Sequence, residues 1–166
     1  MSSSEGTARR ALLAAATALP LAGCGFTRRR TPRLAFSSIA LVGFGPRSPM
    51  AAELTRVLRE QVPVLPAPER AEVVLEALDD ARERSIVAST AAAQVREVQL
   101  RLRLVFLART PSGRLLIPRA ELMTARDLST TESAALAKAH EEAELFREMQ
   151  ADVVQQVLRR LASIAP

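Results

Sequence analysis

Hydrophobic positions recur with two different periods along this chain, one in residues 95–108 and another from Ser129 onward. In residues 95–108 every second side chain is apolar, and Arg101 and Arg103 lie between the apolar ones, which indicates a half-buried strand with a basic outer face. From Ser129 onward apolar residues recur at every third or fourth position, which indicates a long amphipathic helix. The positions that this helix is expected to bury are Leu136, Ala139, Ala143, Phe146, Met149, Val153, Val157 and Leu161.

Shorter patterns predict the remaining elements. Ser48 and Pro49 are suited to cap and begin a short helix, and Ser129 with Glu132 forms a possible capping box for the long one. The other expected elements are strands at 34–44, 71–88 and 115–128, a first helix from Pro49 to about Val62, a proline-rich loop or extended edge at 63–70, a hairpin connection at 89–94, and a bulge or bend around Asp79 and Asp80.

This order of elements predicts an α+β fold. We expect a two-layer sandwich, in which the two helices pack on one face of a mixed four-stranded sheet. The last three strands are expected to form an antiparallel meander. The other face of the sheet, which carries Arg101 and Arg103, is expected to be open.

The first 23 residues have the layout of an export signal. A polar start ends in Arg9 and Arg10, and residues 11–23 carry no charge. A charged region followed by a short apolar run is typical of a secretory signal peptide. The apolar run is shorter than the roughly 20 residues that a membrane-spanning helix needs.

The sequence Leu21-Ala22-Gly23-Cys24 resembles the lipobox of bacterial lipoproteins. We therefore expect a signal peptide at 1–23, lipidation of Cys24, a lipidated tether at 24–33 and one folded domain at 34–166. Two or more acyl chains hold a protein firmly on a bilayer. Gly25, in place of Asp after the cysteine, favours the outer membrane over retention in the inner one, with the domain on the periplasmic side.

Composition narrows the classes of partner and of chemistry. The net charge is +5 with a single cysteine, so an intramolecular disulfide is excluded, and acidic partners such as phosphates, lipid head groups or lipopolysaccharide are favoured over nucleic acid. No metal-ligand cluster or phosphate-binding loop stands out. The only histidine, His140, lies among polar helix residues, so we expect neither an enzyme nor a cofactor.

Three segments resemble one known family over essentially the whole chain. These are "LAGCGF" at the lipid site, "VREVQLRLRL" in the central strand and "ALAKAHEEAELFREMQADVVQQVLRRL" in the last helix. They are similar to the lipopolysaccharide-assembly lipoprotein family LptE. The resemblance implies a non-enzymatic plug inside the outer-membrane β-barrel LptD, which helps that barrel to assemble and to deliver lipopolysaccharide to the outer leaflet.

The resemblance also implies site residues. Lys138, in "ALAK", matches a family lysine linked to lipopolysaccharide binding. The family's second basic position has no counterpart in Ser89–Ala93, and Arg96 is the nearest basic residue. Arg101 and Arg103 are further candidates for contact with phosphates or with an acidic barrel wall.

Alternatives remain for these residues and for the whole chain. A lysine in the position of Lys138 is most often a solvated helix residue paired with an acid such as Glu141 or Glu142, and Arg101 and Arg103 also suit an ordinary solvated sheet face. The chain as a whole also fits a stand-alone, lipid-anchored periplasmic binding protein or an accessory lipoprotein of an envelope transporter.

Overall fold

The computed structural model describes residues 33–89, 95–129 and 135–164. They belong to a compact unit that covers residues 31–166, which we call the body. Cys24, the predicted signal peptide and residues 90–94 of the hairpin connection predicted at 89–94 lie outside the described residues. In chain order the elements are β1 (Ile39–Val42), α2 (Pro49–Leu58), β2 (Val64–Leu65), the 3-10 helix η2 (Pro68–Arg70), β3 (Val73–Ser89), β4 (Val95–Arg109), β5 (Leu115–Ser129) and α3 (Ala135–Leu161).

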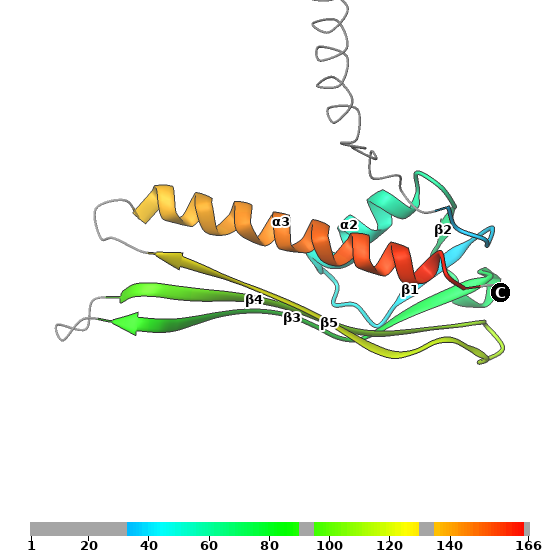
Figure 1. Cartoon of the computed structure of the whole chain (residues 1–166). Helices are drawn as coiled ribbons and strands as arrows, with labels where there is room; N and C mark the ends of the chain where they lie inside the picture. Colours follow the sequence, from blue (N-terminus) through cyan, green and yellow to red (C-terminus); the bar gives the residue numbers. More distant parts are fainter. Residues whose placement is uncertain (1–32, 90–94, 130–134, 165–166) are drawn as a thin grey trace, which may run out of the picture. The chain divides into compact units, whose positions relative to one another are not determined.

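The strands form one mixed sheet in the order β2-β1-β3-β4-β5. β1 pairs in parallel with both β2 and β3, whereas β3, β4 and β5 form the predicted antiparallel meander. Both helices lie over the same face (Figure 1), so the predicted α+β class and the one-sided helix layer are confirmed.

The predicted strand count of four is wrong, because the proline-rich segment contributes a fifth strand. Val64 and Leu65 pair with Ile39 and Ala40. A proline has no N–H to donate to a ladder and is tolerated at a sheet edge. The prolines at 63 and 66 therefore limit β2 to two residues and leave it at the edge.

The helix boundaries differ from the sequence pattern at two points. α2 begins as predicted, since Ser48 Oγ accepts a hydrogen bond from Ala51 N at 2.9 Å and Pro49 is the first helical residue, but it ends at Leu58. The predicted start of the long helix at Ser129 is wrong, because Ser129 is still paired with Glu97 in the β4–β5 ladder. The described part of α3 begins at Ala135.

The core lies between the helices and the covered face of the sheet. Its fully buried members from α3 include Met149, Val153, Val154, Val157, Leu158 and Leu161. In the first half of α3, by contrast, Ala139 and Ala143 are exposed and Phe146 is only half-buried. The sequence pattern thus identified the buried face in the second half of the helix and overestimated burial in the first.

Within the described ranges, the core residues run from Phe36 to Ile164. The body therefore contains a continuous hydrophobic core of its own. Burial of apolar surface is the main driving force of folding, so we conclude that the body folds on its own.

β3 is irregular where the sequence predicted a bend. Its register with β4 shifts between Ala77 and Asp79. Gly43, at the end of β1, adopts a φ of 81°, and a Cβ there would lie 2.1 Å from the carbonyl oxygen of Ala77. Only glycine fits this approach.

Candidate functional site

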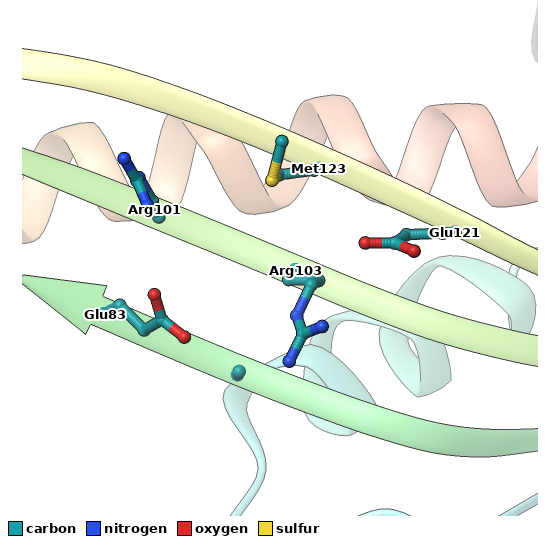
Figure 2. A pocket seen from close by; sticks show the side chains of 6 residues that line it. Glu83, Arg101, Arg103, Glu121 and Met123 are labelled. Atoms are coloured by element: carbon teal, nitrogen blue, oxygen red, sulfur yellow. The ribbon is translucent and has the colours of Figure 1, made fainter.

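The face of the sheet opposite α3 carries a shallow hollow, which we call the open sheet face. Its volume is about 320 Å³, and the strands β3, β4 and β5 each contribute to it. Figure 2 shows its side chains standing on the near side of the strands with the helices behind. The lining residues are Ala81, Glu83, Arg101, Arg103, Glu121 and Met123.

The two arginines of this face are surrounded by acids and amides. Arg103 forms an ion pair with Asp79 at 2.7 Å, and Arg101 Nε donates to Gln99 Oε1 at 2.6 Å. Glu83 lies opposite Arg101 in the register of β3 and β4. Arg101 and Arg103 lie on the outer face of β4 as predicted, and the neighbouring strands add carboxylates to that face that the pattern of β4 alone does not include.

Lys138 does not lie on the open sheet face. It belongs to α3, which covers the face that carries Leu100 and Leu102, opposite Arg101 and Arg103. Its Nζ contacts Glu141 Oε2 at 2.8 Å, one of the two carboxylates that the sequence offered as partners. The structure thus brings Arg101 and Arg103 together but does not bring Lys138 to them. Arg96 lies near the start of β4, and its side chain is outside the described part.

Two arginines that the sequence reasoning did not select meet α3. The Arg82 guanidinium lies 4.6 Å from the centre of the Phe146 ring and donates to Gln150 Oε1 at 3.3 Å. Arg84 Nε donates to Glu142 Oε2 at 3.1 Å. The alternation in "ARER" was the available signal, since it sets Arg82 and Arg84 on one face and Glu83 on the other.

A groove beside the first half of α3 collects these contacts, and we call it the α3 groove. Burial in it lowers the pKa of Arg82, and the nearby Asp80 opposes that shift. Gln150, which is 8% exposed, donates from Nε2 to the carbonyl oxygen of Pro49 at 2.9 Å and thereby connects α3 to α2. The lining residues are Pro49, Arg82, Ala139, Glu142, Ala143, Phe146, Arg147 and Gln150.

Neither surface has the chemistry of a metal centre. In the described ranges, no group of three histidine, cysteine or acidic side chains could hold a metal ion. His140 is exposed, and its Nε2 lies 3.5 Å from Glu144 Oε1. Within the same ranges, none of the helices is both long enough and apolar enough to cross a membrane.

Comparison with known proteins gives a family and a fold. The sequence model of the family described as "LptE: Lipopolysaccharide-assembly" matches residues 36–161. Comparison with curated proteins gave no match.

Solved structures that resemble the chain include three bacterial lipoproteins. The uncharacterized lipoprotein B from Nitrosomonas europaea is 27% identical, with a TM-score of 0.70 over 84% of this chain and 91% of that one. The rare lipoprotein B from Shewanella oneidensis is 23% identical, with a TM-score of 0.62 over 76% and 95% of the two chains. A minor lipoprotein from Acinetobacter baumannii is 21% identical, with a TM-score of 0.63 over 78% and 93%.

Proposed function

The chain belongs to the LptE family of lipopolysaccharide-assembly lipoproteins, and from this membership we propose that it plugs an LptD-type β-barrel of the outer membrane. In this role it helps the barrel to assemble and takes part in delivering lipopolysaccharide to the outer leaflet, without catalysing a reaction. The observation that carries the proposal is the family match over residues 36–161.

The open sheet face is the surface that we assign to the barrel wall. The lumen of an outer-membrane barrel is polar, and this face presents paired charges and amides: Arg103 with Asp79, and Gln99 with both Arg101 and Asp127. Mixed charges favour a specific, correctly oriented polar contact more than they add raw affinity. This chemistry supports docking against a polar wall.

Lipopolysaccharide contact is assigned to the start of α3. Lys138 is held by Glu141, and Arg84 of β3 is held by the next residue of the helix, Glu142. Arg84 thus supplies, from β3, a second basic group near Lys138, whereas the hairpin sequence Ser89–Ala93 carries none. Exchange of these exposed carboxylate partners for phosphates costs little, since exposed ion pairs contribute about 0–1 kcal/mol.

The lipid anchor completes the proposal. Acylation of Cys24 together with removal of residues 1–23 would hold the body at the periplasmic side of the outer membrane through the tether 24–33. Family membership and the lipoprotein relatives support this location.

Co-purification tests the proposed function. Extraction of the lipidated chain in mild detergent should recover a β-barrel of much larger mass in a stoichiometric complex. Replacement of Glu83 and Glu121 by Lys should lower that recovery by on the order of tenfold or more, because it reverses two charges of the pattern that the wall would complement, and mismatched charges at an interface cost several kcal/mol.

In the matched control, Glu60 and Glu69, two carboxylates outside this face, are replaced by Lys. This variant undergoes the same change in net charge and should leave recovery unchanged. Recovery of a monomer alone from wild type would contradict the plug and favour the stand-alone lipoprotein. Equal recovery with both double variants would remove the open sheet face from the interface.

A further inference from the structure

The arginines of the body differ in how their charges are neutralised. Several arginines along α3 and the sheet form ion pairs: Arg84–Glu142, Arg126–Asp152 and Arg147–Glu144. Arg114 and Arg160 form no ion pair within the described residues. Both lie at the end of the body where α3 ends and where β4 turns into β5, and they leave positive charge there that no carboxylate of the described residues neutralises.

The helix dipole does not account for this charge. Arg159 and Arg160 lie in the last turn of α3, where cations are favoured by the negative end of the dipole. That end carries only about half an elementary charge. The two guanidinium groups of the helix and a third on the turn at Arg114 together carry a positive charge several times larger than this.

Arg114 and Arg160 line the same shallow hollow, of about 390 Å³. Its other walls are mainly aliphatic, from Leu115 to Pro118 and Ile164, and none of its lining residues is acidic. Leu115 is 58% exposed. Guanidinium groups suit phosphates, and an exposed leucine beside them suits acyl chains. We call Arg114, Leu115 and Arg160 the end patch.

The end patch lies at the end of the sheet where the chain enters the body. The strand registers place Leu115, Arg109, Val74 and Ala40 in one row across β5, β4, β3 and β1. Figure 1 shows the first described residues, in blue, at the same end as the last turn of α3, in red, and the turn between β4 and β5. Neighbouring strands are about 4.8 Å apart, so the row from β5 to β1 spans roughly 15 Å.

The tether is long enough for the end patch to reach the bilayer that would hold the lipidated Cys24. Cys24 precedes Arg33 by nine residues, and an extended segment of that length reaches about 30 Å. Acyl chains at Cys24 can therefore lie in a membrane while the end patch meets its surface.

We propose that the end patch binds the surface of an anionic phospholipid bilayer next to the lipid anchor. This inference rests on the proposed lipidation of Cys24 and concerns a surface separate from the open sheet face. Arg114 and Arg160 contact lipid phosphates, and Leu115 enters the acyl boundary. The bilayer contact would hold the body in one orientation relative to the membrane.

Vesicle binding by the isolated body, residues 31–166, tests the inference without the anchor. The body should bind vesicles of phosphatidylethanolamine with phosphatidylglycerol, and bind vesicles of phosphatidylcholine at least tenfold more weakly. Replacement of Arg114 and Arg160 by Gln should weaken binding to the anionic vesicles about 25-fold, since each basic residue at an anionic surface contributes about fivefold. Leu115→Ser should weaken it about fivefold at unchanged charge, because it removes apolar area that the lipid would cover.

The matched control replaces Arg126 and Arg147, which are paired with Asp152 and Glu144, by Gln. This control loses the same net charge and should keep binding within about twofold, because paired cations contribute little to a surface contact. Thermal melting of each variant verifies that the body is folded.

Three results would overturn the inference: equal binding to the two kinds of vesicle, equal losses in the two double variants, or binding only when lipopolysaccharide is present in the vesicles. None of them bears on recovery of the barrel complex, so failure of this inference is distinguishable from failure of the proposed function.

Discussion

Lys138 is the residue on which the proposed lipopolysaccharide contact depends. Its ammonium is held at 2.8 Å by Glu141, with the Arg84–Glu142 pair beside it. Both carboxylates are partly exposed, so lipid phosphates can replace them at small cost. The residue is therefore a basic group that is loosely engaged before ligand binds.

Lys138→Asp should weaken binding of lipopolysaccharide to the isolated body by about tenfold. Each basic residue near an anionic head group contributes on the order of 1 kcal/mol, and the reversed charge adds repulsion. Titration of fluorescent lipopolysaccharide at fixed salt measures the change.

Arg56→Asp is the control for this variant. Arg56 lies on α2 and is paired with Glu53 three residues before it, as Lys138 is paired with Glu141 three residues after it. The control should bind like wild type. Unchanged affinity in Lys138→Asp, or an equal loss in both variants, would remove Lys138 from the site.

At the scale of elements, α3 has two halves with different roles. From Met149 to Leu161 it supplies fully buried side chains to the core. Its first half instead presents Ala139 and Ala143 to the α3 groove and holds Phe146 beneath Arg82. The second half stabilises the fold, and the first half is available for binding.

Alanine substitutions should separate the two halves. Leu158→Ala should destabilise the body by about 2–5 kcal/mol, because Leu158 is 0% exposed and its removal leaves a cavity. Phe146→Ala should cost only about 1–2 kcal/mol, from partial burial and a cation–π contact of about 0.5–1 kcal/mol.

Urea unfolding measures both free energies. Equal losses would mean that the first half of α3 packs as tightly as the second, and would contradict the division of the helix. A circular dichroism spectrum typical of helix in both variants, before urea is added, shows that each starts from its folded state.

At the scale of the whole molecule, the core and the proposed anchor are independent. The buried cluster runs from Phe36 to Ile164, whereas Cys24 lies twelve residues before it in sequence. We therefore expect the body to fold without lipidation and the proposed lipid to serve only to locate it.

Cys24→Ala should leave a precursor that keeps residues 1–23 and carries no acyl chain, since alanine has no sulfur to acylate. Its body should melt at the wild-type temperature, because no core residue changes. Mass spectrometry of the N-terminal peptide and a thermal melt measure the two outcomes.

An acylated or normally cleaved variant would refute the lipobox, and a lowered melting temperature would refute the independence of the body. Ala35→Ser, at an exposed position near the start of the body, gives the level of change expected from a neutral surface substitution in the melting experiment.

Much of the architecture was determined by the sequence alone, because it depends on local periodicity. The period of two in 95–108 and the shift to a longer period in the last helix were enough for β4, for α3 and for the α+β class. Ser48 and Pro49 were enough for the start of α2. The family resemblance likewise depended on contiguous segments.

Only the tertiary structure decided which strands share a face and which side chains meet. The acids around Arg101 and Arg103 come from β3 and β5, so the charge of the open sheet face depends on strand register, which no single segment contains. The same holds for Arg82 beneath Phe146 and for the end patch, where Arg114 and Arg160 are distant in sequence. A pattern along one strand or helix records which side is buried, but contacts between distant segments form only when the whole core packs.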